Sequence, residues 1–179
     1  MPASGPVLRF GNRCLREVCD PLEPGGAEAA EVLDALWGTL ETGDGVGLAA
    51  PQIGILRRAL VVRDHRSRRR PVRLELVNPV ITGLFGEERF FEEGCLSFPG
   101  LYLPVKRPRG VAVGYFDRQG RERTLRDEDL VARIVQHEVD HLDGRLFIDH
   151  LSPWRKLAAA PRLGAIRLGR LWKREADCR

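Results

Sequence analysis

Two histidines separated by one turn of a predicted helix are the residues best suited to chemistry. They are His137 and His141 in QHEVDHLDG (136–144), and Glu138 directly follows the first of them. Imidazoles at helix positions i and i+4 can bind one divalent ion from a rigid backbone, and a glutamate beside them can move protons. This pattern predicts a metal site that activates a water molecule for hydrolysis.

Two histidines do not complete a catalytic site, because a protein usually supplies three ligands and leaves a position open. His150 follows nine residues after His141, beyond a glycine turn, and its spacing matches no third-ligand motif, so we predict a surface or packing residue. Cys95 in EEGCLSFPG (92–100) is the stronger candidate. It follows a glycine in a predicted turn between strands, from which a thiolate can point into a pocket.

The helix that carries the histidines is predicted over residues 127–143. Acidic side chains in its first turn favour the positive end of the helix dipole, and Gly144 follows its last turn. At about 100° per residue, four side chains share one face that we expect to point inward, namely Leu130, Ile134, His137 and His141. Three polar residues lie on another side: Arg133, Gln136 and Asp140.

The remaining elements indicate an α+β fold, with mostly antiparallel β-strands packed around the central HExxH helix and with an N-terminal and a C-terminal helix. Apolar spacing predicts the N-terminal helix over residues 27–41. The C-terminal helix is expected to begin with Ser152 as N-cap and Pro153 as first residue, and to be weakened or interrupted by Pro161 and Gly164. Strands are predicted at 59–63, 73–81, 88–93, 110–117 and 121–125.

Length and composition are those of an ordinary globular protein. The 179 residues suit one domain, residues 1–179, with 43% hydrophobic and 30% charged residues. No apolar run approaches the length that spans a bilayer, which argues against a membrane protein. The N-terminus lacks the features of a secretory signal or a transit peptide, so we expect a cytoplasmic protein.

The net charge of +4 is concentrated near the C-terminus. Residues 152–179 carry eight basic and two acidic residues, which gives +6 and leaves −2 for residues 1–151. A second basic cluster, residues 63–73, has six arginines and is predicted to be a solvated turn between two strands. Neither cluster has a pattern that indicates sequence-specific nucleic-acid binding.

Three motifs together resemble the peptide deformylase family of bacterial type. The family motifs GxGxAAxQ, EGCxS and QHExDHxxG correspond here to GVGLAAPQ (45–52), EGCLS (93–97) and QHEVDHLDG (136–144), and every fixed position is present in the same order. The resemblance extends from about residue 6 to residue 153. It implies an enzyme that removes the N-formyl group from the N-terminal formyl-methionine of nascent polypeptides and releases formate.

The resemblance also implies a role for each matching residue. Cys95, His137 and His141 would bind the metal, a water activated by the metal would attack the formyl carbon, and Glu138 would act as general acid and base. The Gln52 side chain and the Leu96 backbone N–H would stabilise the oxyanion. The substrate methionine would contact Val46, Leu130 and Ile134, while glycines in the first motif, including Gly47, would let the substrate backbone approach closely.

The expected cofactor is one divalent metal ion. The family works with Fe²⁺, which is easily lost or oxidised, and purified protein can contain Zn²⁺, Ni²⁺ or Co²⁺, because the Cys/His/His set does not choose between them. The expected partners are N-formyl-methionyl nascent peptides, with a ribosome contact through the basic tail as a hypothesis. The basic residues concerned are Arg155, Lys156, Arg162, Arg167, Arg170, Lys173 and Arg174.

Two other functions fit parts of the pattern: an HExxH metallopeptidase and a non-catalytic ribosome-associated metal protein. The first needs neither GxGxAAxQ nor a cysteine ligand, and the second is expected to have lost Glu138 or Gln52. The chain also departs from many bacterial members, which carry an arginine six to eight residues beyond the motif cysteine, where this chain has Leu101, Tyr102 and Leu103. Glu93 and Arg107 are either an ion pair that steadies the cysteine loop or two unrelated surface charges.

Overall fold

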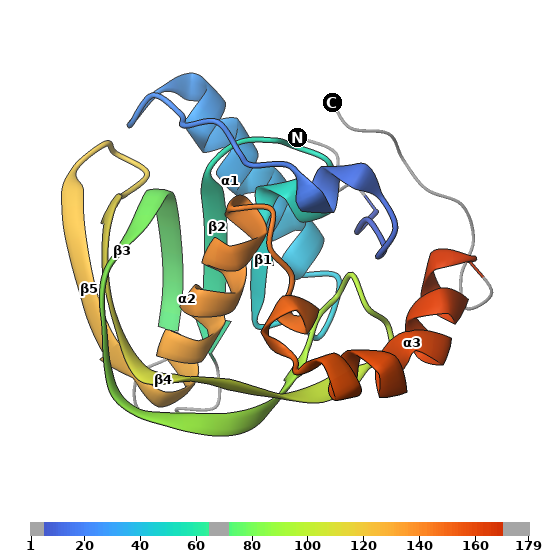
Figure 1. Cartoon of the computed structure of the whole chain (residues 1–179). Coiled ribbons are helices and arrows are strands. Elements are labelled where there is room, and N and C mark those ends of the chain that lie inside the picture. Colours follow the sequence, from blue (N-terminus) through green and yellow to red (C-terminus); the bar gives the residue numbers. More distant parts are fainter. Residues whose placement is uncertain (1–5, 65–71, 170–179) are drawn as a thin grey trace.

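The computed structural model describes residues 6–64 and 72–169. Five antiparallel strands form one sheet in the order β1-β2-β3-β4-β5, with β1 Gly47–Ala49, β2 Ala59–Asp64, β3 Val72–Gly94, β4 Tyr102–Phe116 and β5 Glu122–Glu128. The sheet curves around helix α2, Asp129–Leu142, which runs through the middle of the molecule (Figure 1). The α+β prediction is therefore confirmed.

The longest strands differ from their predicted limits. Residues 73–81 and 88–93 were expected to be separate strands, and both lie in β3. The glycines between them do not form a turn, because three register shifts absorb the irregularity and Gly86 adopts a φ of +77° within the strand. β4 begins at Tyr102, not at residue 110. Its first half pairs with β3 but not with β5, and such an edge tolerates Pro104 and Pro108.

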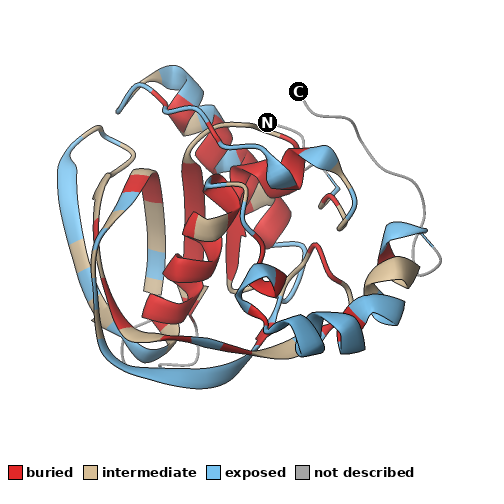
Figure 2. Cartoon of the chain, in the orientation of Figure 1, coloured by how far each residue is buried: buried red, intermediate tan, exposed pale blue. Residues whose placement is uncertain are grey.

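Helix α2 begins two residues later than predicted. Asp127 and Glu128 continue β5, where they pair with Val111 and Gly110 of β4, and the helix starts at Asp129. Strand pairing therefore outweighs the preference of acidic side chains for the first helical turn. Gly144 follows the helix with a φ of +68°, as its position predicts. Apart from its first residues and Asp140, the helix is buried (Figure 2).

The other helices cover opposite parts of the molecule. Helix α1, Ala27–Leu40, agrees with the prediction and packs its apolar face against β1 and β2. Helix α3, Pro153–Arg167, starts at the predicted N-cap but is not interrupted. Pro161 removes only one backbone donor, and buried Ala159 and Ile166 hold both halves of the helix against the protein. Within the described residues, no helix is long and apolar enough to cross a membrane.

Short 3₁₀ segments place the remaining loops. They are η1 Arg13–Arg16, η2 Ala50–Ile53 and η3 Phe147–His150. The first sequence motif, residues 45–52, includes strand β1, which η2 follows directly. Phe98 and Phe147 pack edge to face in an apolar cluster that also contacts Cys95 in the loop after β3. Strand β1 with η2, the loop after β3 and helix α2 thus meet around one central site.

Candidate metal centre

The three predicted metal ligands lie together. Cys95 follows the end of β3, and His137 and His141 project from α2, with one ligand atom from each within 4.8 Å of the others. Cys95 Sγ is 3.3 Å from His141 Nε2. Ligand bonds of about 2.0–2.3 Å to one ion suit donor atoms at this separation. The donor set therefore fits a single iron or zinc ion, and two of the three donors are buried.

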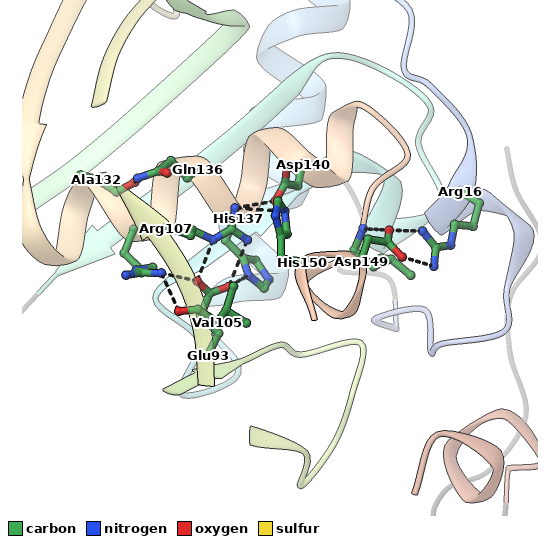
Figure 3. Close-up of polar contacts among 12 residues, drawn as sticks. Arg16, Glu93, Val105, Arg107, Ala132, Gln136, His137, Asp140, Asp149 and His150 are labelled. Atoms are coloured by element: carbon green, nitrogen blue, oxygen red, sulfur yellow. Dashed lines mark hydrogen bonds and ion pairs between the residues drawn. The ribbon is translucent and has the colours of Figure 1, made fainter. Parts of the chain in front are cut away.

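A buried carboxylate orients the first histidine. Glu93 Oε2 is 3.0 Å from His137 Nδ1, and Arg107 donates to both Glu93 oxygens at 2.7 and 3.1 Å (Figure 3). Burial alone raises the pKa of Glu93, but the hydrogen bonds from His137 and Arg107 bring it well below its ordinary value. Glu93 therefore stays ionised and occupies His137 Nδ1, which leaves Nε2 as the ring nitrogen available to a metal ion. Of the two alternatives for Glu93 and Arg107, the ion pair is present.

Arg133 is a site residue that the sequence interpretation missed. It was placed on the polar side of α2, yet its side chain is only 11% exposed and lies in the wall of the site. Its guanidinium donates to Glu93 Oε1 at 3.1 Å, to the Val105 carbonyl at 3.2 Å and to the Arg89 carbonyl at 2.8 Å. Its position one helical turn before His137 is a signal that could have identified it.

Glu138 is buried beside the ligands. Burial, as the largest cause, raises the pKa of its carboxyl to about 7. Its Oε2 has no hydrogen-bond partner among the described residues, which suits a carboxylate that faces a reacting group. A side-chain carbon at Gly47 would lie 2.5 Å from Glu138 Oε1 and 2.6 Å from Ile134 Cγ2. A side chain at position 47 would therefore displace this carboxylate or Ile134.

The Gln52 amide has a defined orientation. Its Oε1 accepts from the Ala49 backbone N–H at 2.8 Å, so its NH₂ group points the other way, 3.5 Å from Cys95 Sγ and 3.3 Å from Ser97 Oγ. Gln52 is 1% exposed. A buried amide with its acceptor occupied presents donors to the space beside the cysteine. This arrangement can stabilise an oxyanion there.

A cavity of about 410 Å³ opens at these groups. All four residues expected to contact substrate line it, namely Val46, Gly47, Leu130 and Ile134. Phe91 and Tyr102 also border the cavity and are 52% and 63% exposed. The departure from the family pattern at position 102 therefore places an exposed aromatic ring at the mouth of the site.

His150 does not join the ligands. It is exposed, and its Nε2 lies 2.8 Å from Asp140 Oδ2 and 3.4 Å from Arg107 Nη1 (Figure 3). Arg107 also donates to Asp140 at 2.6 Å. Hydrogen bonds thus connect the surface at His150, through Arg107 and Glu93, to the candidate ligand His137. The predicted surface position of His150 agrees with the structure.

Comparison with known proteins decides the family. Residues 5–157 match the family model described as polypeptide deformylase. The chain belongs to the polypeptide deformylase family. A peptide deformylase of Fusobacterium nucleatum subsp. nucleatum is 40% identical over 163 residues, which cover 90% of this chain and 91% of that protein.

Solved structures of deformylases agree with the fold. The peptide deformylase of Legionella pneumophila has a TM-score of 0.83 and 35% identity, covering 96% of this chain and all of that chain. A class I type b peptide deformylase of Acinetobacter baumannii, solved with Met-Ala-Ser bound, has a TM-score of 0.78 and 34% identity, covering 84% of this chain and 100% of that one. As a deformylase, the protein is a hydrolase that removes the N-formyl group from nascent peptides.

Proposed function

We propose that Cys95, His137 and His141 bind the catalytic metal ion and that Glu138 moves the protons of the reaction. The observation that carries this proposal is the convergence of the three ligand atoms within 4.8 Å beside a buried, unpaired carboxylate oxygen. When bound, the ion supplies a positive charge that lowers the pKa of a water molecule and polarises a carbonyl oxygen. Fe²⁺ is the proposed native ion, and Zn²⁺, Ni²⁺ or Co²⁺ can replace it in purified protein.

Proton transfer and oxyanion stabilisation are carried out by groups of the protein itself. Glu138 accepts a proton from the attacking water and delivers it to the nitrogen that leaves as the new N-terminal amine. Its pKa of about 7 suits both halves of this transfer near neutral pH. The Gln52 NH₂ group and the Leu96 backbone N–H donate to the oxygen on which negative charge develops.

The cavity determines which substrate enters. Val46, Leu130 and Ile134 provide an apolar wall for an unbranched side chain such as methionine, and Gly47 lets the peptide backbone lie against β1. The Met-Ala-Ser bound to the Acinetobacter baumannii deformylase supports this proposal. We propose that the substrates are N-formyl-methionyl nascent peptides in the cytoplasm.

The metal assignment is tested by comparing two cysteine variants. Protein prepared without oxygen and supplied with Fe²⁺ is assayed for formate release from an N-formyl-methionyl tripeptide and for bound metal. Cys95→Ser is expected to lose metal and activity. Cys19→Ser is the matched control, because burial raises the pKa of Cys19 to about 12 and it lies in the core between α2 and the sheet.

The outcome separates the alternatives. Retained metal and activity in Cys95→Ser would contradict the ligand assignment. Cleavage of internal bonds in unformylated peptides would indicate metallopeptidase activity instead. The identity of the ion is tested by exposing the purified protein to air. Activity is expected to fall as Fe²⁺ is oxidised, and equal activity after prolonged exposure would count against iron.

We also propose a ribosome contact through the basic C-terminal segment. Four of its basic residues are exposed on α3: Arg155, Lys156, Arg162 and Arg167. Arg170, Lys173 and Arg174, which belong to the same prediction, lie outside the described residues, as do residues 65–71 of the second basic cluster. Binding to RNA phosphates is expected to weaken with salt. If replacing all seven of these residues by Gln leaves co-sedimentation with ribosomes at low salt unchanged, the proposal is wrong.

A further inference from the structure

Three consecutive residues near the N-terminus contact both halves of the proposed oxyanion site. We call residues 8–10 the N-terminal strap. The Leu8 backbone N–H donates to the Gln52 carbonyl at 2.7 Å, and the Phe10 N–H donates to the Ser97 carbonyl at 2.9 Å. Between them, Arg9 Nη1 donates to the Leu96 carbonyl at 2.5 Å. The strap thus joins the η2 turn to the loop that follows β3.

This connection matters because the two oxyanion donors come from separate parts of the chain. Gln52 lies in η2 and Leu96 in the loop after β3, and neither segment is adjacent to the other in sequence. A donor displaced by about 1 Å from its productive position can cost roughly a hundredfold in rate. The N-terminal strap links the two backbone segments independently of the metal. It therefore keeps the two donors at a fixed distance and orientation.

Each of the two peptide units that flank Leu96 accepts a hydrogen bond at its carbonyl. The Cys95 carbonyl accepts from the Phe98 N–H at 2.8 Å, and because a peptide unit is planar, the Leu96 N–H points in the opposite direction. The next peptide unit carries the Leu96 carbonyl, which Arg9 binds. The peptide units on both sides of Leu96 are thereby held, and the direction of its N–H is determined by both.

The position of Arg9 is defined by its surroundings. Leu8 is 1% exposed, and Phe10 stacks on Phe98 with ring centroids 4.9 Å apart, so apolar contacts anchor the strap on both sides of Arg9. The Arg9 side chain borders the central cavity. The Arg9 guanidinium is thereby held where it can donate to the Leu96 carbonyl.

We infer that Arg9 is a positioning residue for deformylation, which holds the Leu96 N–H in register with the Gln52 amide through the Leu96 carbonyl. This inference rests on the oxyanion roles proposed above for Gln52 and Leu96. Arg9 does not touch the reacting atoms in this account. Its removal should therefore lower the rate of the chemical step without changing substrate affinity or metal binding.

The test compares Arg9→Met and Arg9→Lys with the parent protein, all loaded with Fe²⁺ without oxygen. Met keeps the length of the stem but removes the donor and the charge, whereas Lys keeps a donor and the charge. We expect kcat to fall about tenfold in Arg9→Met, less than the roughly 10²–10³ lost with an oxyanion donor itself. KM should stay within about twofold, because in this proposal Arg9 acts through the Leu96 carbonyl and not by binding substrate. Arg9→Lys should recover most of kcat.

The control is Arg57→Met, which removes an arginine that donates to Glu28 at 2.6 Å and does not line the cavity. Its kcat should equal that of the parent. Four results would overturn the inference: an Arg9→Met kcat no lower than that of the control, a raised KM with unchanged kcat, a loss of bound metal in proportion to activity, or no recovery of kcat in Arg9→Lys.

Gln52→Ala separates this inference from the proposed function. If the parent releases formate and Gln52→Ala loses kcat, the oxyanion proposal stands, and a normal Arg9→Met then contradicts only the role of Arg9. If Gln52→Ala keeps the parental kcat, the oxyanion proposal itself is wrong and the inference falls with it. If the parent with full metal content releases no formate, the assay contradicts the proposed function before Arg9 is considered.

Discussion

Replacing Glu93 by Gln should weaken both folding and metal binding. The Glu93 and Arg107 side chains are each 4% exposed, and removing one partner of a buried ion pair costs about 3–5 kcal/mol. Arg107 keeps its ion pair with Asp140 at 2.6 Å, so we expect the loss in free energy of unfolding to lie at the lower end of this range, about 3 kcal/mol. For a protein of this size, that loss lowers the melting temperature by roughly 6–12 °C.

The same change should affect the metal through His137. Glutamine has one acceptor oxygen where glutamate has two, and Arg107, Arg133 and His137 all use the Glu93 carboxylate. Loss of such an outer hydrogen bond typically lowers metal affinity by about 10–100-fold. Urea denaturation gives the free energy of unfolding, and competition with a chelator gives the metal affinity.

Glu75→Gln is the matched control for this experiment. Glu75 accepts two hydrogen bonds from Arg118 and one from the Trp37 indole, and none of its hydrogen bonds among the described residues reaches the proposed metal ligands. Glu75→Gln should lower the free energy of unfolding and leave metal affinity unchanged. Two results together would contradict this expectation: a free energy of unfolding for Glu93→Gln within about 1 kcal/mol of the parent, and an unchanged metal affinity. Removing one partner of an ion pair as buried as this one should lower the free energy of unfolding by about 3–5 kcal/mol.

Three further outcomes are expected. Gly47→Ala should lower kcat by about a hundredfold in a formate-release assay while the protein stays folded, since its methyl group displaces the Glu138 carboxylate. A rate near that of the parent would show that this carboxylate can shift without loss of activity. Leu130→Ala should reduce the kcat/KM preference for formyl-methionyl over formyl-alanyl peptides by roughly 10-fold or more, and an unchanged ratio would place the methionine pocket elsewhere. Burial raises the pKa of Glu75, but hydrogen bonds from Arg118 and Trp37 lower it overall. The ionised Glu75 carboxylate therefore stabilises the protein fully above the pKa that Glu75 has in the unfolded chain, and this stabilisation is lost as the pH falls through the lower pKa of the folded protein. Urea titrations should therefore show Glu75→Gln destabilised near neutral pH and almost equal to the parent at acid pH, whereas a pH-independent difference would contradict the lowered pKa.

The sequence allowed the central parts of the site to be predicted because their spacing is local. His137 and His141 are one helical turn apart, and the apolar positions of the same helix place Leu130 and Ile134 beside them. Helix periodicity also predicted α1 within one residue. These features depend on the geometry of one element, which a short stretch of sequence determines.

The parts that were missed depend on contacts between distant residues. Arg9 binds a carbonyl 87 residues away, and Arg133 binds carbonyls of β3 and β4. Strand pairing likewise determined that Asp127 and Glu128 belong to β5, although their acidic side chains fit a helix start equally well. Register shifts in β3 hid its continuity, because glycine in a bulge and glycine in a turn look the same in sequence.

The most direct test of the account is formate release by Glu138→Gln with full metal occupancy. Glutamine preserves the size of the side chain but cannot accept and return a proton. Glu138→Gln is expected to have normal metal content and a kcat at least about a hundredfold below that of the parent on an N-formyl-methionyl tripeptide. A variant that binds metal normally and releases formate within a few-fold of the parental rate would contradict the role of Glu138, and with it the proposed chemistry of the site.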